Sequence, residues 1–98
     1  MSVDSIDPKA ARNIWNEYVA FSSYEDSQHS IVNFENYSHV KAHAIPQEAN
    51  AVGPAIRTMK HHCFVSTVYT DPALIEPAKA FGEKFRTLMK TGSDKHVV

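Results

Sequence analysis

The sequence predicts a small α+β domain in which two amphipathic helices pack on one face of an antiparallel sheet, in the chain order α-β-β-α. Three observations lead to this fold class. Two stretches repeat apolar residues with helical spacing, and two stretches between them are rich in β-branched and aromatic residues. The length of 98 residues leaves room for one domain, which we expect to span residues 1–98.

The composition excludes several classes of protein. Ten Lys and Arg against eleven Asp and Glu give a net charge of −1, so the chain lacks the basic surface of a nucleic-acid or polybasic membrane binder. A single cysteine, Cys63, rules out an intrachain disulfide and a multi-thiolate zinc site. No apolar run is long enough to span a bilayer, and residues 1–9 lack the features of a secretory signal. We therefore expect a cytoplasmic protein with no nucleic-acid partner and no membrane partner.

The first helix is predicted over residues 8–22. Asp7 is a strong N-cap, and Pro8 fits the first helical position, where its missing N–H costs nothing. Apolar residues then recur on one helical stripe that includes Ile14, Trp15 and Tyr18.

Two strands are predicted over residues 29–38 and 61–70. In the first, alternation places Val32 and Phe34 toward the core and leaves Glu35 on a mixed polar and aromatic face. In the second, Cys63 falls on one face and Phe64 on the other. Residues 39–59 contain two prolines and a glycine, so no long regular element is expected there.

The last helix begins at a second Asp-Pro pair, Asp71 and Pro72, and ends at Gly92. Pro77 lies inside this pattern, so either residues 72–76 form a separate turn before a helix that starts at Pro77, or the helix kinks there. Residues 93–98 are expected to fray. Two strands alone make a marginal sheet, so further strands must come from residues 39–59, from a second copy or from another polypeptide.

Several short motifs follow one another in an order seen in a known family: Trp15 and Tyr18, Phe34-Glu35, Val40-Lys41-Ala42, Ala44-Ile45-Pro46, Ala49 to Val52, Arg57, and Tyr69 to Leu74. Over residues 11–89 this order resembles the C-terminal part of the substrate domain in fungal FAD-linked oxidases of the berberine-bridge-enzyme type. The resemblance implies a sheet face that covers the flavin ring, with Glu35 as the nearest match to a family acidic residue that can act as a base.

The chain departs from this family in ways that limit the expected chemistry. Residues 36–38 replace the glycines that follow the acid in many relatives, and residues 54–57 lack the histidine of a family Pro-His-Arg segment. The flavin domain and its attachment residues are absent. We therefore expect no cofactor for the chain alone, and FAD only if a flavin-binding partner completes it.

Candidate site residues follow from the face assignments and from this resemblance. Glu35 is the candidate catalytic base, and its alternative is a solvated carboxylate paired with Lys41 or Arg57. The candidate ligand-binding residues are Ile31, Tyr37, Arg57, Thr67 and Tyr69.

Histidine and cysteine do not point to a further site. The sequence has six histidines, of which His39 and His43 are four residues apart, but no convergent set predicts a metal site. Cys63 lies beside histidines and could be a thiolate nucleophile, but it is expected to be a buried, inert thiol, because no helix start adjoins it and it lies amid strand residues.

The leading interpretation is an accessory module, not catalytic alone, that binds a small ligand or a partner on its free sheet face. We expect a homo-oligomer or a partner chain joined through a sheet edge. One alternative is a small homodimeric cyclase or isomerase that uses Glu35 and a histidine. Another is a fragment of an FAD-dependent oxidoreductase that another chain completes.

Overall fold

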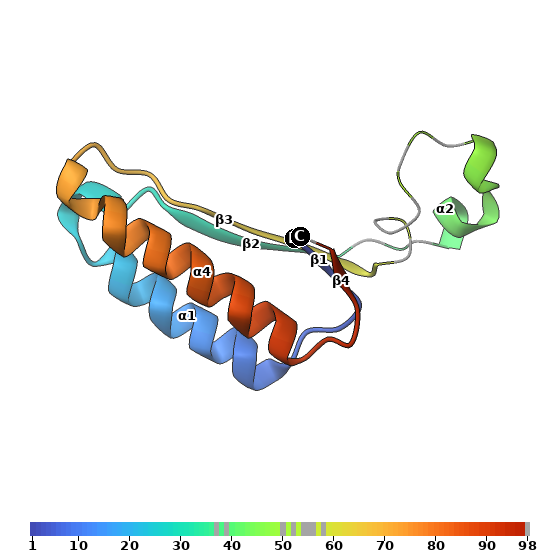
Figure 1. The fold of residues 1–98 in the computed structure, drawn as a ribbon, viewed down its shortest axis with the longest axis horizontal. Coiled ribbons are helices and arrows are strands. Elements are labelled where there is room, and N and C mark those ends of the chain that lie inside the picture. The colour runs from blue at the N-terminus through green and yellow to red at the C-terminus, as the bar shows by residue number, and fades with distance from the viewer. Residues whose placement is uncertain are drawn as a thin grey trace.

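The fold is a two-layer α+β domain, as the sequence predicts, with two helices on one face of an antiparallel sheet (Figure 1). The computed structural model describes residues 1–36, 38, 40–49, 51, 53, 57 and 59–97. Its main elements are β1 (Ser2–Val3), α1 (Pro8–Ser22), β2 (Ile31–Asn36), α2 (Val40–Ala44), β3 (His61–Ser66), α4 (Ile75–Thr91) and β4 (His96–Val97). Without the short helix α2, the chain order is β-α-β-β-α-β, which is the order of ferredoxin-like folds.

The sheet has four strands in the order β2-β3-β1-β4, and every neighbouring pair is antiparallel. The additional strands that the two-strand prediction required come from the ends of the described chain. The described residues between 39 and 59 contribute no strand; they contain α2 and a 3-10 turn, Gln47–Ala49. The expectation that residues 93–98 fray is wrong for His96 and Val97, because they pair with Val3 and Ser2 of β1.

Helix α1 covers the predicted range without change. The Asp7 carboxylate accepts a hydrogen bond of 2.8 Å from the Ala10 N–H, which satisfies a donor of the first turn. Pro8 occupies the first helical turn. Asp7 and Pro8, from which the sequence predicts the helix, are therefore the residues at which it begins.

Helix α4 begins two residues before Pro77, after a 3-10 turn that spans Pro72–Leu74. Asp71 caps this turn by accepting a hydrogen bond of 2.9 Å from the Ala73 N–H. Pro77 lies in the first turn of α4, where a backbone N–H has no carbonyl acceptor within the helix, so its missing N–H requires neither a later start nor a kink.

Both strands are shorter than predicted, and β3 ends at Ser66 rather than Thr70. The Asp26 carboxylate accepts hydrogen bonds from the N–H of Asp71 at 2.7 Å and from the N–H and hydroxyl of Thr70 at 2.6 and 2.8 Å. These bonds lower the pKa of Asp26 and attach residues 70–71 to the turn after α1. The chain therefore leaves the sheet before Thr70.

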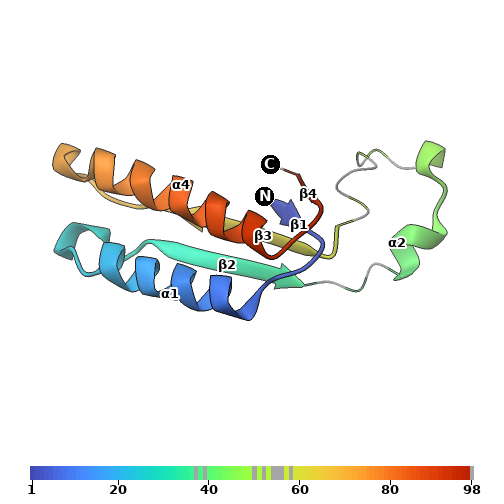
Figure 2. The ribbon, with the colours of Figure 1, turned by 60° about the horizontal axis from the view of Figure 1, so that its bottom comes forward.

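The core lies between the sheet and the two helices, which lie side by side (Figure 2). Val3, Ile14 and Cys63 are at most 1% exposed. Phe85 and Met89 of α4 complete this cluster, and partly buried residues of β2 and β3 pack against it. Gly92 lies so close to Asp7 that an added Cβ would meet the Asp7 nitrogen at 2.7 Å, so the junction of α4 with the start of α1 requires a glycine.

No helix in the described part of the chain is both long and apolar enough to cross a lipid bilayer.

The burial of Ile14 predicts a large effect of its truncation. We expect Ile14→Ala to lower the free energy of unfolding by about 2–5 kcal/mol, because it leaves a cavity in the main core. The matched control is Val19→Ala on the same helix, where the side chain is 47% exposed and the change should be below about 1 kcal/mol. Urea unfolding of both variants checks this, and equal losses would contradict the position of the core.

Candidate functional site

The face of the sheet opposite the helices is the first candidate site. The register pairs Val32 with Val65 and Phe34 with Cys63, and these four residues face the core. The alternate residues therefore point to the other side, which neither α1 nor α4 covers (Figures 1 and 2). We call this side the open face; on β2 and β3 it comprises Ile31, Asn33, Glu35, His62, Phe64 and Ser66.

Three polar residues form one row across the open face. Glu35 of β2 pairs with His62 of β3, which pairs in turn with Ser2 of β1. The Ser2 hydroxyl lies 2.8 Å from His62 Nδ1, and this hydrogen bond orients the imidazole ring. Residues directly opposite on neighbouring strands have Cβ atoms about 4.5–5.5 Å apart, so one small molecule can contact both Glu35 and His62. Ser2 is only 8% exposed, so it acts by orienting His62.

The Glu35 carboxylate is held within its own strand. The Asn33 amide donates a hydrogen bond of 2.8 Å to Glu35 Oε1. This contact fixes the carboxylate over the open face. No ion pair joins Glu35 to Arg57 in the described part of the chain, where the Arg57 guanidinium donates to the Gln47 side chain and to the carbonyl oxygens of Ala42 and Ile45.

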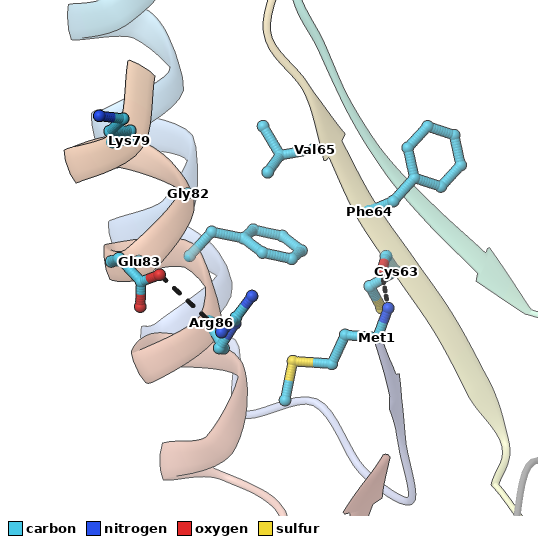
Figure 3. A pocket seen from close by; sticks show the side chains of 9 residues that line it. Met1, Cys63, Phe64, Val65, Lys79, Gly82, Glu83 and Arg86 are labelled. Carbon is cyan, nitrogen blue, oxygen red and sulfur yellow. Dashed lines mark hydrogen bonds and ion pairs between the residues drawn. The ribbon is translucent and has the colours of Figure 1, made fainter. Parts of the chain in front are cut away.

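Apolar side chains flank this polar row. Ile31 is 49% exposed and Phe64 is 41% exposed. Figure 3 shows the Phe64 side chain on the opposite side of β3 from α4. The open face therefore combines a row of hydrogen-bonding groups with an exposed aromatic ring.

The structure brings together only part of the predicted ligand-binding set. Ile31 and Glu35 share the open face. Tyr37 lies outside the described residues. Arg57 belongs to the segment that leaves the sheet after β2, where its guanidinium donates to the carbonyl oxygens of Ala42 and Ile45.

The two residues predicted beyond β3 do not join the open face. Tyr69 packs against the second core cluster, which contains Phe21 and Phe81, on the helix side of the sheet. Thr67 follows the end of β3 and is half-buried. Thr67 and Tyr69 alternate with Cys63 and Val65, which face the helices, so even a longer strand would turn both residues away from the open face.

Sequence reasoning did not select Ser2, Asn33 or His62. His62 could have been found, since it alternates with Phe64 and therefore faces away from Cys63. Asn33 likewise alternates with Glu35. Ser2 carries no such signal, because a strand of two residues shows no alternation.

The second candidate site is a hollow between α4 and β3, which has a volume of about 450 Å³. Its lining consists of Met1, Cys63, Phe64, Val65, Lys79, Gly82, Glu83, Phe85 and Arg86. In Figure 3 the Met1, Cys63 and Val65 side chains lie between β3 and the helix, and Glu83 and Arg86 form an ion pair at the helix surface. The wall is thus apolar and the rim is charged.

The thiol in this hollow is a weak nucleophile. Cys63 is 1% exposed, and its desolvation raises the pKa of the thiol from 9.0 to about 11. The thiol is therefore protonated at neutral pH, which lowers its reactivity.

The described residues contain no group of three or more His, Cys, Asp or Glu side chains arranged to hold a metal ion. His43 Nε2 lies 2.6 Å from the Arg57 carbonyl oxygen, and His39 lies outside the described residues.

No family model matches this chain, and no curated protein and no solved structure shows significant similarity to it. The resemblance to FAD-linked oxidases therefore rests on the motifs in the sequence alone.

The raised pKa of Cys63 predicts a loss of stability at alkaline pH. The folded-state pKa lies above the unfolded value, so the contribution is complete below pH 9 and is lost as the pH rises toward about 11. We expect the urea midpoint of the wild-type chain to fall more steeply over this interval than that of Cys63→Ala, which has no thiol to ionise. Parallel slopes for the two proteins would show that the thiol does not contribute.

Proposed function

We propose that this protein is a ligand-binding module whose site is the open face of its sheet. The observation that carries this proposal is the row formed by Ser2, His62 and Glu35 on three adjacent strands. An ordered row of polar groups beside exposed apolar side chains is what small-ligand sites require, because polar groups orient a ligand and apolar contacts supply affinity.

The chemistry of the row indicates the ligand class. Glu35 is an acceptor when ionised, while His62 can donate or accept. Phe64 offers a ring face or edge for aromatic contact. These groups together favour a small aromatic compound that carries an O–H or N–H donor. A carboxylate ligand is disfavoured, because it would meet the charge of Glu35.

Chemical-shift mapping tests this site with 4-aminophenol as the probe and benzoate as the repelled comparison. We expect 4-aminophenol to shift the amide resonances of β2 and β3, and expect Glu35→Gln and Phe64→Ala each to weaken its binding about tenfold or more. The control is Glu83→Gln on α4, which removes an equal charge from the helix side and should leave binding unchanged.

Shifts confined to the helix side, or equal binding to all three variants, would overturn the assignment of the open face. Stronger binding of benzoate than of 4-aminophenol would overturn the ligand class.

A second candidate function is proton transfer by a cofactor-free enzyme, which the direct pairing of Glu35 with His62 favours. In this reaction Glu35 removes a proton from the carbon beside a carbonyl group, and His62 gives a proton to the carbonyl oxygen, which yields an enol. Such a step would serve a cyclase or isomerase. Positioned acids and bases of this kind contribute about 10²–10⁴-fold to a rate.

Deuterium exchange of cyclohexanone in D₂O tests this candidate, followed by NMR. If the pair is catalytic, the wild-type chain accelerates exchange, and Glu35→Gln and His62→Gln each reduce the acceleration at least about 100-fold. Glu83→Gln serves again as the matched control. Exchange that is unaffected by Glu35→Gln would exclude Glu35 as the base.

The flavin-related alternative requires a partner chain. Both Asp-Pro helix starts are capped by carboxylates, since Asp7 accepts from Ala10 and Asp71 accepts from Ala73. A pyrophosphate at either position would meet negative charge where FAD sites present free amide groups. These two helix starts therefore do not favour a pyrophosphate site, and this alternative places FAD on the completing chain. We place the protein in the cytoplasm, on the basis of its cysteine content.

A further inference from the structure

Strand β2 forms one edge of the sheet, and its outer side has unpaired backbone groups. The Cys63 N–H donates a hydrogen bond of 2.8 Å to the Met1 carbonyl oxygen, and the Met1 ammonium donates one of 3.0 Å to the Cys63 carbonyl oxygen. Cys63 therefore directs its backbone groups toward β1. Because its cross-strand partner is Phe34, the backbone groups of Phe34, and of Val32 two residues before it, point outward from the sheet.

Glu35 is the one charged residue of this edge, which lacks the other features that protect edge strands. Proteins usually block such edges with proline, with lysine or with a bulge. The sequence of β2 is IVNFEN, which contains no proline and no basic residue, and its six residues pair with β3 without an interruption. The edge is therefore long and regular enough to pair with another strand.

An apolar hollow runs beside the edge, between β2 and α1. It has a volume of about 260 Å³, and its lining consists of Ala11, Ile14, Trp15, Tyr18, Ile31, Val32 and Phe34. Trp15 is 55% exposed, and Val19 on the same helix is 47% exposed. A free edge and exposed apolar side chains thus lie on the same side of the molecule.

We propose that a second copy of this chain occupies this surface by pairing its β2 antiparallel to the first, about a two-fold axis at Asn33. In this register Val32 lies opposite Phe34 of the second copy, and Phe34 lies opposite its Val32. Both residues have outward backbone groups, so these pairs form the hydrogen bonds of the new ladder. Their side chains are apolar and lie on the helix side, which makes this surface self-complementary.

The same axis brings the two α1 helices together. Trp15 lines the hollow with Val32 and Phe34, on either side of Asn33 in the strand, so Trp15 of each copy lies near the axis. Antiparallel α1 helices then place the exposed Val19 of one copy near Ala11 of the other. The helix layer and the sheet continue together across the interface, which removes the exposed apolar side chains from water.

The dimer also changes the open face. In the proposed register Ile31 of one copy lies opposite Glu35 of the other on that face. The second copy therefore supplies an apolar side chain beside each Glu35, while both open faces stay accessible. This inference does not depend on the ligand proposal.

Cysteine cross-linking tests the register in a Cys63→Ala background, which removes the native thiol. Asn33 lies on the axis as a non-hydrogen-bonded pair with itself, for which Cα atoms are about 4.5 Å apart and within disulfide range. We expect Asn33→Cys to form a disulfide-linked dimer under mild oxidation. Phe64→Cys is the matched control, because Phe64 pairs with Asn33 on the same face but lies one strand inward.

Light scattering on the unmodified chain and on lysine variants gives an independent measurement. We expect twice the monomer mass of 11.0 kDa, a shift to monomer in Asn33→Lys by repulsion at the axis, and a retained dimer in Phe64→Lys. Folding of each variant is checked by circular dichroism. The proposal is overturned if the wild-type chain is a monomer, or if it is a dimer that Asn33→Cys does not cross-link. A cross-link through Phe64→Cys would also overturn it, because it would indicate pairing of the open faces.

Discussion

The pairing of β2 with β3 in a single register is the constraint on which the rest of the structure depends. A shift by one residue would turn Val32 and Phe34 away from the helices and bring Glu35 into the core. The buried position of Cys63, next to Ile14 and Phe85, excludes such a shift, since the core has no place for a carboxylate. The register that fills the core therefore also sets which side chains form the open face.

The sequence is most informative where a structure is determined by local contacts. Residues 8–22 form a helix because Asp7 and Pro8 act within one turn, and both residues can be recognised in the sequence as a helix start. Strands β1 and β4 depend instead on distant partners. Asp4 donates to the Lys95 carbonyl oxygen, and residues this far apart leave no periodic pattern. The sequence therefore predicts neither strand, although both complete the sheet.

The candidate site was predictable in part for the same reason. Alternation within β2 places Ile31 and Glu35 on one face, as the structure shows. Tyr69 does not belong with this face, because it alternates with Cys63 and Val65, and all three pack on the helix side. Arg57 was grouped with Glu35 by its position in a motif, whereas its hydrogen bonds to carbonyl oxygens hold it in the segment beyond β2. The contacts of Arg57 leave no signal that composition or spacing can reveal.

The two-layer arrangement leaves the open face and the six-residue β2 edge of the sheet available, and the two have different consequences for the polar row. Pairing of two open faces would bury Glu35 and His62 against each other, and burial of ionisable groups without full hydrogen bonding is costly. Pairing at the β2 edge satisfies outward amide and carbonyl groups instead, and it leaves the row in contact with solvent. The edge is also the side on which α1 exposes Trp15, whereas the open face is divided by the polar row. The distribution of apolar and polar groups therefore favours association at the edge and ligand binding on the face.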